Sequence, residues 1–176
     1  VNEGGGYAVF TVSANAGQTM NLALSNGTSN PTATSGTDYT NALEYWDPTA
    51  NSNAGAWVAY SAGFTVPGTS NAAASLYVRV AISNDGTFEN AEDFNLTATY
   101  TSGASRSATG VATIVDDGTG TNYTGSMSGG TPVTNTTSLN DDRALTVNSI
   151  TVNEGGGYAV FTVSANAGQT MNLALS

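Results

Sequence analysis

Apolar and polar side chains alternate along this chain in short runs, and the runs are separated by Gly, Ser, Thr, Asn and Pro. From residue 7 to residue 12 every second side chain faces the same apolar side, and residues 19–24 repeat this alternation. A period of two predicts half-buried β-strands. The polar residues 15–18 predict a turn between these two strands.

The strongest strand pattern covers residues 76–82, where Leu76, Val78, Val80 and Ile82 share one face. Residues 42–46 and 56–60 are expected to pair as a hairpin. Further strands are predicted at residues 64–66, 94–100 and 107–115. Seven or more short strands with frequent turn residues predict an all-β fold, a two-sheet antiparallel sandwich.

The pattern weakens after residue 117, because residues 118–142 are mostly Gly, Thr, Ser and Asn with little apolar area to bury. We therefore expect a sandwich domain at residues 1–117, a connector at 118–142 and the start of another unit at 143–176. The alternative is that the connector folds back as extra strands of the same sandwich.

The chain contains a long internal repeat, because residues 1–25 recur without a mismatch as residues 152–176. The offset is 152 − 1 = 151 residues, which is the size of a whole domain rather than of a solenoid unit. The repeat predicts a tandem array of identical domains, of which this chain is one period and a short overlap. One sandwich needs one copy of these strands, so residues 152–176 are expected to complete the sandwich of a neighbouring molecule; left alone they would be a sticky edge.

Composition excludes several functions. The formal net charge is −10, from 13 acidic and 3 basic residues, and such a surface disfavours nucleic acids and direct contact with anionic membranes. The absence of Cys and His removes zinc, copper, haem and iron–sulfur sites and leaves oxygen-ligated ions. Without Lys as well, Schiff-base, Ser-His and Cys-His chemistry is excluded. No apolar run approaches the length of a membrane span.

Five strings in order resemble a known family. They are NEGG at residues 2–5, GTDY at 36–39, FTVPG at 64–68, VRVAISNDGTFENAEDFNLT at 78–97 and ATIVDDG at 112–118. In this order and spacing the chain resembles a Calx-β domain, a calcium-binding immunoglobulin-like sandwich. The long identical repeat and the Thr/Asn/Gly-rich composition also resemble the extender region of giant RTX adhesins, which bacteria secrete through type I systems. The resemblance implies an extracellular extender repeat on the bacterial cell surface that projects a distal ligand-binding region.

The Calx-β resemblance implies bound Ca²⁺, which takes 6–8 oxygen ligands and favours several carboxylates. The acids that match the family pattern, with two that precede the second copy, are Glu3, Asp38, Asp85, Glu89, Glu92, Asp116, Asp117, Asp141, Asp142 and Glu154. The alternative is that these acids are ordinary solvated loop residues. Asp141 and Asp142 either supply half of a site at the junction between repeats or solvate a loop. The loop at 83–86 has fewer acids than richer relatives, which implies fewer or weaker sites.

A cluster of aromatic residues predicts a second function. Tyr39, Tyr45, Trp46, Trp57 and Tyr60 lie in one segment, and such rings can bind sugars. The alternative function is therefore a calcium-dependent carbohydrate-binding or homophilic adhesion module. Most of these rings are expected in the core, with tryptophan packed between the sheets. A paired Glu89 and Glu92 could serve a glycosidase, but no cleft-forming pattern accompanies them, so we expect no enzyme.

Overall fold

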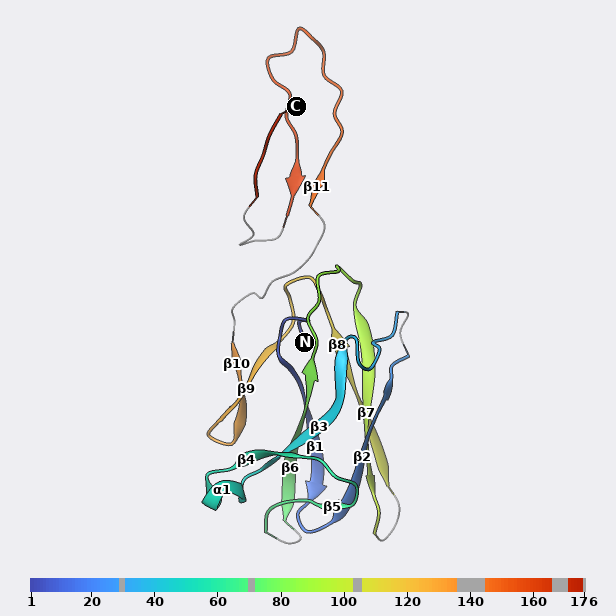
Figure 1. Ribbon diagram of the computed structural model, residues 1–176, viewed down its shortest axis with the longest axis vertical. Coiled ribbons are helices and arrows are strands. Elements are labelled where there is room, and N and C mark those ends of the chain that lie inside the picture. The colour runs from blue at the N-terminus through green and yellow to red at the C-terminus, as the bar shows by residue number, and fades with distance from the viewer. Residues whose placement is uncertain (29–30, 70–71, 103–105, 136–144, 166–170, 176) are drawn as a thin grey trace.

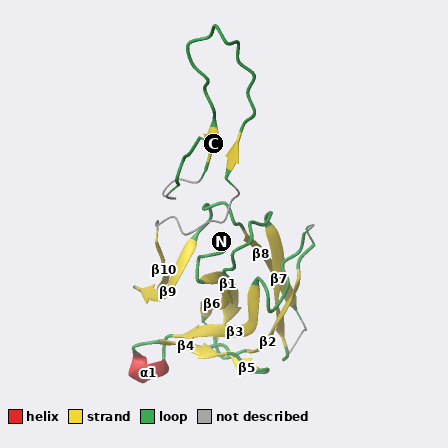
Figure 2. Cartoon of the chain, turned by 45° about the horizontal axis from the view of Figure 1, so that its top comes forward, coloured by secondary structure: helices red, strands yellow, loops and turns green. Residues whose placement is uncertain are grey.

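The computed structural model describes residues 1–28, 31–69, 72–102, 106–135, 145–165 and 171–175. These residues form an all-β structure whose main body is an antiparallel sandwich (Figures 1 and 2). Its strands are β1 (Tyr7–Asn15), β2 (Thr19–Asn26), β3 (Tyr39–Asp47), β4 (Ala56–Ala59), β5 (Phe64–Thr65), β6 (Ala73–Ile82), β7 (Glu92–Tyr100), β8 (Ser107–Ile114), β9 (Asn122–Ser128) and β10 (Thr131–Asn135). One sheet has the order β10-β9-β1-β6-β3-β4 and the other the order β5-β2-β7-β8.

Strand β6 lies inside the six-stranded sheet, as its long apolar face predicts. Leu76, Val78, Val80 and Ile82 are all buried. On one side β6 pairs with β1 in an unbroken register from Tyr7↔Ala81 to Asn15↔Ala73, and on its other side it pairs with β3. The alternation of residues 76–82 therefore predicted both the strand and its inward face correctly.

The first two strands lie in different sheets. β1 pairs with β6, whereas β2 pairs with β7 from Met20↔Tyr100 to Asn26↔Phe94 and with β5. The turn between them therefore carries the chain from one sheet to the other. The apolar faces of the two strands consequently meet the core from opposite sides, and Met20 and Leu22 are buried there beside Phe10 and Val12.

The core contains two groups of buried side chains, one of which lies under the end where β3 and β7 begin. In that group Phe94 and Tyr39 stack with their ring centroids 4.2 Å apart, and both rings are almost completely buried. Ile82 and Ile114 pack into the same group. These residues anchor the backbone immediately beside several of the predicted ligands.

The hairpin predicted at residues 42–60 is confirmed, with Trp46 paired to Trp57 across β3 and β4. The expectation that tryptophan packs between the sheets is wrong. Tyr45 packs against the core, and alternation along β3 therefore turns Trp46 to the outer face. Trp57 shares that face and meets Trp46 edge to face. A short turn, α1 (Ala50–Asn53), lies within the hairpin and contains residues with positive φ.

Residues 118–142, expected to be a connector, contribute β9 and β10. β9 pairs with β1 at Tyr7↔Tyr123 and so extends the six-stranded sheet. The hairpin is joined to the sheet by polar contacts, because Trp57 Nε1–H and Arg79 Nη1–H both donate to the Gly125 carbonyl at 2.7 Å. This matches the alternative in which the segment folds back as extra strands.

The second copy of the repeated sequence does not fold as the first copy does. Two short strands, β11 (Thr146–Val147) and β12 (Val163–Ser164), pair with each other. Figure 1 shows this part beyond the end of the sandwich where the N-terminus lies. Its large apolar side chains are exposed, including Tyr158, Val160, Leu173 and Leu175.

Candidate metal centre

Antiparallel pairing brings five strand ends to one end of the sandwich. The beginning of β1 lies beside the end of β6, the beginning of β3 also lies beside the end of β6, and the beginning of β7 lies beside the end of β8. Acidic residues occupy or flank each of these strand ends. The carboxylates gathered there, which we call the acidic end, are Glu3, Asp38, Asp85, Glu89, Glu92 and Asp116.

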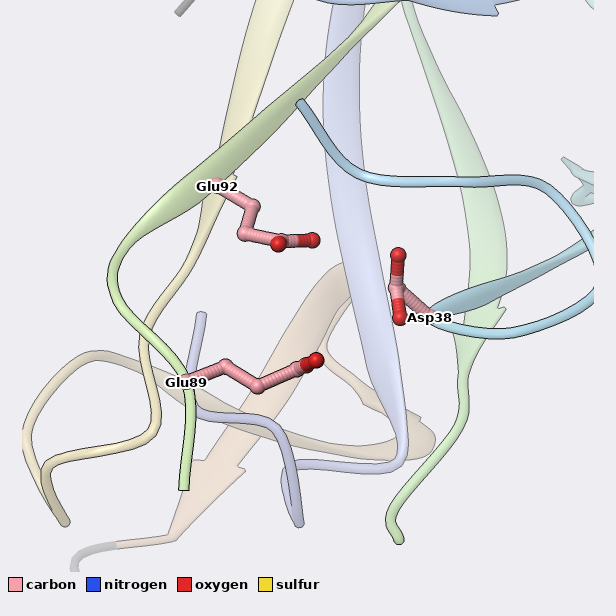
Figure 3. Close-up of side chains that lie close together, drawn as sticks. All are labelled: Asp38, Glu89 and Glu92. Atoms are coloured by element: carbon pink, nitrogen blue, oxygen red, sulfur yellow. The ribbon is translucent and has the colours of Figure 1, made fainter. Parts of the chain in front are cut away.

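Three of these side chains form a compact group that can hold a cation. The carboxylates of Asp38, Glu89 and Glu92 each offer an oxygen, and these oxygens lie within 4.8 Å of one another. Figure 3 shows the three side chains pointing toward a common space. Ca²⁺ binds oxygen at 2.3–2.6 Å, so ligands on opposite sides of one ion are up to about 5 Å apart. The spacing of the group therefore fits a single Ca²⁺.

Two further carboxylates hold the loop that supplies part of this group. Glu3 and Asp116 are both buried. Glu3 Oε1 accepts a hydrogen bond from the Asp85 N–H at 2.8 Å, and Asp116 Oδ2 accepts one from the Glu89 N–H at 3.0 Å. The loop between β6 and β7 is thus fastened at two points to the strand ends beside it, which places Glu89 near Asp38 and Glu92.

Asp38 itself is fixed by the loop that precedes β3. Its Oδ2 accepts the N–H of Thr34 at 2.5 Å, while its backbone N–H donates to the Thr34 carbonyl at 3.0 Å. Its carbonyl accepts the N–H of Ser83 at 2.9 Å, which ties the start of β3 to the end of β6. In Figure 3 the Asp38 carboxylate faces the two glutamates.

The crowding of acids changes their protonation. Burial, a hydrogen bond that protonated Glu92 donates to Asp38, and the charges of Asp38, Glu89 and Glu3 raise the pKa of Glu92 to about 7. The pKa of Glu89 is raised by burial and by the charges of Asp38, Asp85 and Asp116. The pKa of Glu3 is also raised, mainly by burial, although the hydrogen bond from Asp85 opposes the shift. In all three groups burial, and after it the charges of neighbouring acids, disfavours the ionised form.

The other two predicted ligands within the described residues are Asp117 and Glu154. Asp117 Oδ1 accepts hydrogen bonds from the backbone N–H, at 2.9 Å, and from the hydroxyl of Thr119, so it stabilises its own turn. Glu154 is exposed in the second copy. Asp141 and Asp142 lie outside the described residues. The structure therefore gathers six of the predicted residues at the acidic end.

Sequence reasoning missed Asp93, a buried carboxylate next to the site. Its Oδ2 accepts the N–H of Thr28 at 3.3 Å, and its carbonyl accepts the N–H groups of Gly27 and Ala33 at 3.1 and 3.0 Å. A Cβ at Gly27 would lie 1.9 Å from Asp93 Oδ1. Asp93 therefore holds the loop after β2, a role that only its burial in the fold reveals.

The geometry of the acidic end supports binding of a hard cation. The chain matches no protein-family model, no curated protein and no solved structure. Within the described residues, no helix has the length and apolar character needed to cross a membrane.

Proposed function

We propose that this chain is a calcium-stabilised repeat of the Calx-β-like, immunoglobulin-like kind, acting as a structural extender in a bacterial cell-surface adhesin. The observation that carries the calcium assignment is the group formed by Asp38, Glu89 and Glu92, whose oxygens lie within 4.8 Å of one another. Like charges at this separation oppose folding unless they are protonated or neutralised. A divalent cation neutralises them and uses their oxygens as ligands.

Calcium titration by calorimetry tests this assignment. The unaltered chain should bind Ca²⁺, and Glu92→Gln should weaken binding at least about tenfold, because one charged ligand is lost. Glu154→Gln is the matched control, since the same chemical change falls on an exposed side chain of the second copy. The calcium site is contradicted if the unaltered chain gives no heat of binding. It is also contradicted if both substitutions weaken Ca²⁺ binding equally.

The extender role is supported by the repeat of 151 residues and by the position of the acidic end. Residues 1–25 recur as 152–176, so an array would present one such site in every period. The Val1 carbonyl accepts the N–H of Val115 at 2.9 Å, and Asn135 at the end of β10 pairs with Asn122. Asn122 lies beside Gly5. The residues before β1 and the end of β10 thus both lie at the acidic end. Calcium bound there would stiffen the connection between successive repeats.

A carbohydrate-binding or homophilic adhesion module is the second candidate, and one observation favours it. Trp46 and Trp57 lie on the outer face of the sheet, with ring centroids 5.6 Å apart. Trp57 already donates to Gly125 and has the Arg79 guanidinium 4.4 Å from its ring centroid, which leaves Trp46 as the ring to test. Glycan binding that disappears in Trp46→Ala would favour this candidate over the extender.

A further inference from the structure

The chain holds one amino-acid sequence in two environments. Residues 152–165 and 171–175 are identical to residues 1–14 and 20–24. Leu22 is 5% exposed in the first copy, whereas its counterpart Leu173 is 71% exposed. Met20 is 2% exposed and its counterpart Met171 is 39% exposed. The second copy therefore carries a core-forming face that this sandwich does not cover.

The structure shows which surface fits that face. In the first copy, β1 pairs with β6 along its whole length, and β2 pairs with β5 and β7. We call these partners of β1 and β2, the strands β5, β6 and β7, the receptor surface. Because the second copy has the same side chains, it can make the same hydrogen bonds and apolar contacts with the receptor surface.

The second copy can also reach the receptor surface of its own chain. Asn135 pairs with Asn122, and Asn122 Oδ1 lies 3.1 Å from a Cβ built on Gly5. The end of β10 is therefore close to the start of β1. The roughly 21 residues from Asn135 to Gly156, the counterpart of Gly5, extend up to about 70 Å. Neighbouring strands are about 5 Å apart, so this length is ample.

We propose that residues 152–175 are a donor segment that takes the place of β1 and β2 on the receptor surface of this chain when the first copy cannot occupy it. The product is a circularly permuted sandwich, with β10 preceding the donor strands in the chain. Asn153 and Glu154 then take the positions of Asn2 and Glu3. The proposal rests on sequence identity and strand register, and is independent of calcium.

The test uses the full chain with two buried residues of one copy changed to aspartate. Met20→Asp with Leu22→Asp places two carboxylates in the core, which costs several kcal/mol when they are unpaired. The donor segment should then replace the first copy, and cooperative thermal unfolding should persist. Hydrogen exchange measured by mass spectrometry should show protection moving from residues 7–24 to residues 158–175.

Matched variants complete the design. Met171→Asp with Leu173→Asp should leave stability unchanged, because both side chains are exposed. Changing all four residues should abolish cooperative unfolding, since neither copy can then be buried. The proposal is overturned if the first pair of substitutions unfolds the chain as completely as all four do. It is equally overturned if residues 7–24 keep their protection in that variant.

Discussion

At the residue scale, the fold places Glu92 beside Asp38 and Glu89, whose negative charges disfavour its own ionised form. The fold and the charges therefore oppose each other at this residue. It begins β7 and pairs with Ile114, so the buried Phe94 two residues later fixes its backbone. Burial and the neighbouring acids raise the pKa of Glu92 to about 7, so the acid relieves the repulsion either by keeping a proton or by binding a cation.

This conflict predicts an unusual dependence of stability on pH in the absence of calcium. Between pH 4.5, the usual pKa of glutamate, and about pH 7, folded Glu92 keeps a proton that the unfolded chain has lost. The free energy of unfolding should consequently fall as pH rises through this window. Denaturant unfolding in a chelator at pH 5, 6, 7 and 8 measures the fall.

Glu92→Gln supplies the control for this prediction, because it removes the titrating group and retains the shape of the side chain. The substitution should flatten the pH dependence in chelator and raise stability at pH 8. With saturating Ca²⁺ the unaltered chain should lose this fall between pH 5 and 7, because Glu92 is then ionised in both the folded and the unfolded chain. A chain in chelator that is more stable at pH 8 than at pH 5 would contradict the assignment of this pKa.

The membership of the acidic end could be predicted from sequence only in part. Glu3, Asp85 and Asp116 follow from the strand pattern, because alternating strand directions bring the relevant strand ends together. The local turn that engages Asp117 with Thr119 depends on backbone geometry, and the adjacent Asp116 and Asp117 look equivalent in the sequence. The burial of Asp93 depends on the loop after β2, whose path no periodicity specifies.

At the element scale, the β9–β10 hairpin approaches the rest of the sheet closely at Gly125. Gly125 has a φ of +78°, and a Cβ there would lie 2.6 Å from Cε2 of Tyr7. Its carbonyl accepts hydrogen bonds from Trp57 and Arg79. Arg79 also lies over the ring of Tyr7 at 4.2 Å. The hairpin therefore attaches through a backbone group and a stacked arginine instead of an apolar face.

Gly125→Ala should detach this hairpin, and Gly129→Ala is its matched control. Both glycines have positive φ, but a Cβ on Gly129 meets nothing within 4 Å. The left-handed conformation alone costs alanine about 1–2 kcal/mol, so Gly125→Ala should cost clearly more than the control. Urea unfolding gives the difference, and Trp57 fluorescence reports release of the indole. Equal losses in both variants would show that the contact with Tyr7 contributes nothing.

Most strands of the sandwich could be predicted because their apolar positions alternate, as residues 76–82 illustrate. The hairpin at residues 122–135 could not be, because its sequence is polar and its partners lie on the outer face of β4 and β6. The outward position of Trp46 and Trp57 could not be predicted for the same reason, because the segment that contacts this outer face is distant in the sequence. A sequence pattern identifies one buried face, whereas the covering of the outer face depends on which distant segment reaches it.

At the scale of the whole molecule, the candidate cation site and the path of the chain meet at the acidic end. The N-terminus and β10 both lie near that end (Figure 1), so successive repeats in an array would be joined through residues beside the carboxylates. The far end of the sandwich lies off the path between repeats. In such an array, charge repulsion at the acidic end would affect both the stability of one sandwich and the freedom of the next.

Removing calcium should accordingly change two properties together. An ion present at 100 times its dissociation constant adds about 2.7 kcal/mol per site, which for a sandwich of this size corresponds to roughly 10 °C in melting temperature. Chelator should lower the melting temperature by at least this amount. In a protein with two repeats in tandem, it should also broaden the distribution of distances between the two sandwiches, measured by small-angle X-ray scattering.

Magnesium at equal concentration tests ion identity, because its smaller, rigid octahedral coordination suits this loop cluster poorly. If chelator changes neither the melting temperature nor the distance distribution, calcium has no part in the proposed extender. If it changes the melting temperature alone, calcium stabilises the single sandwich but does not stiffen the connection between repeats.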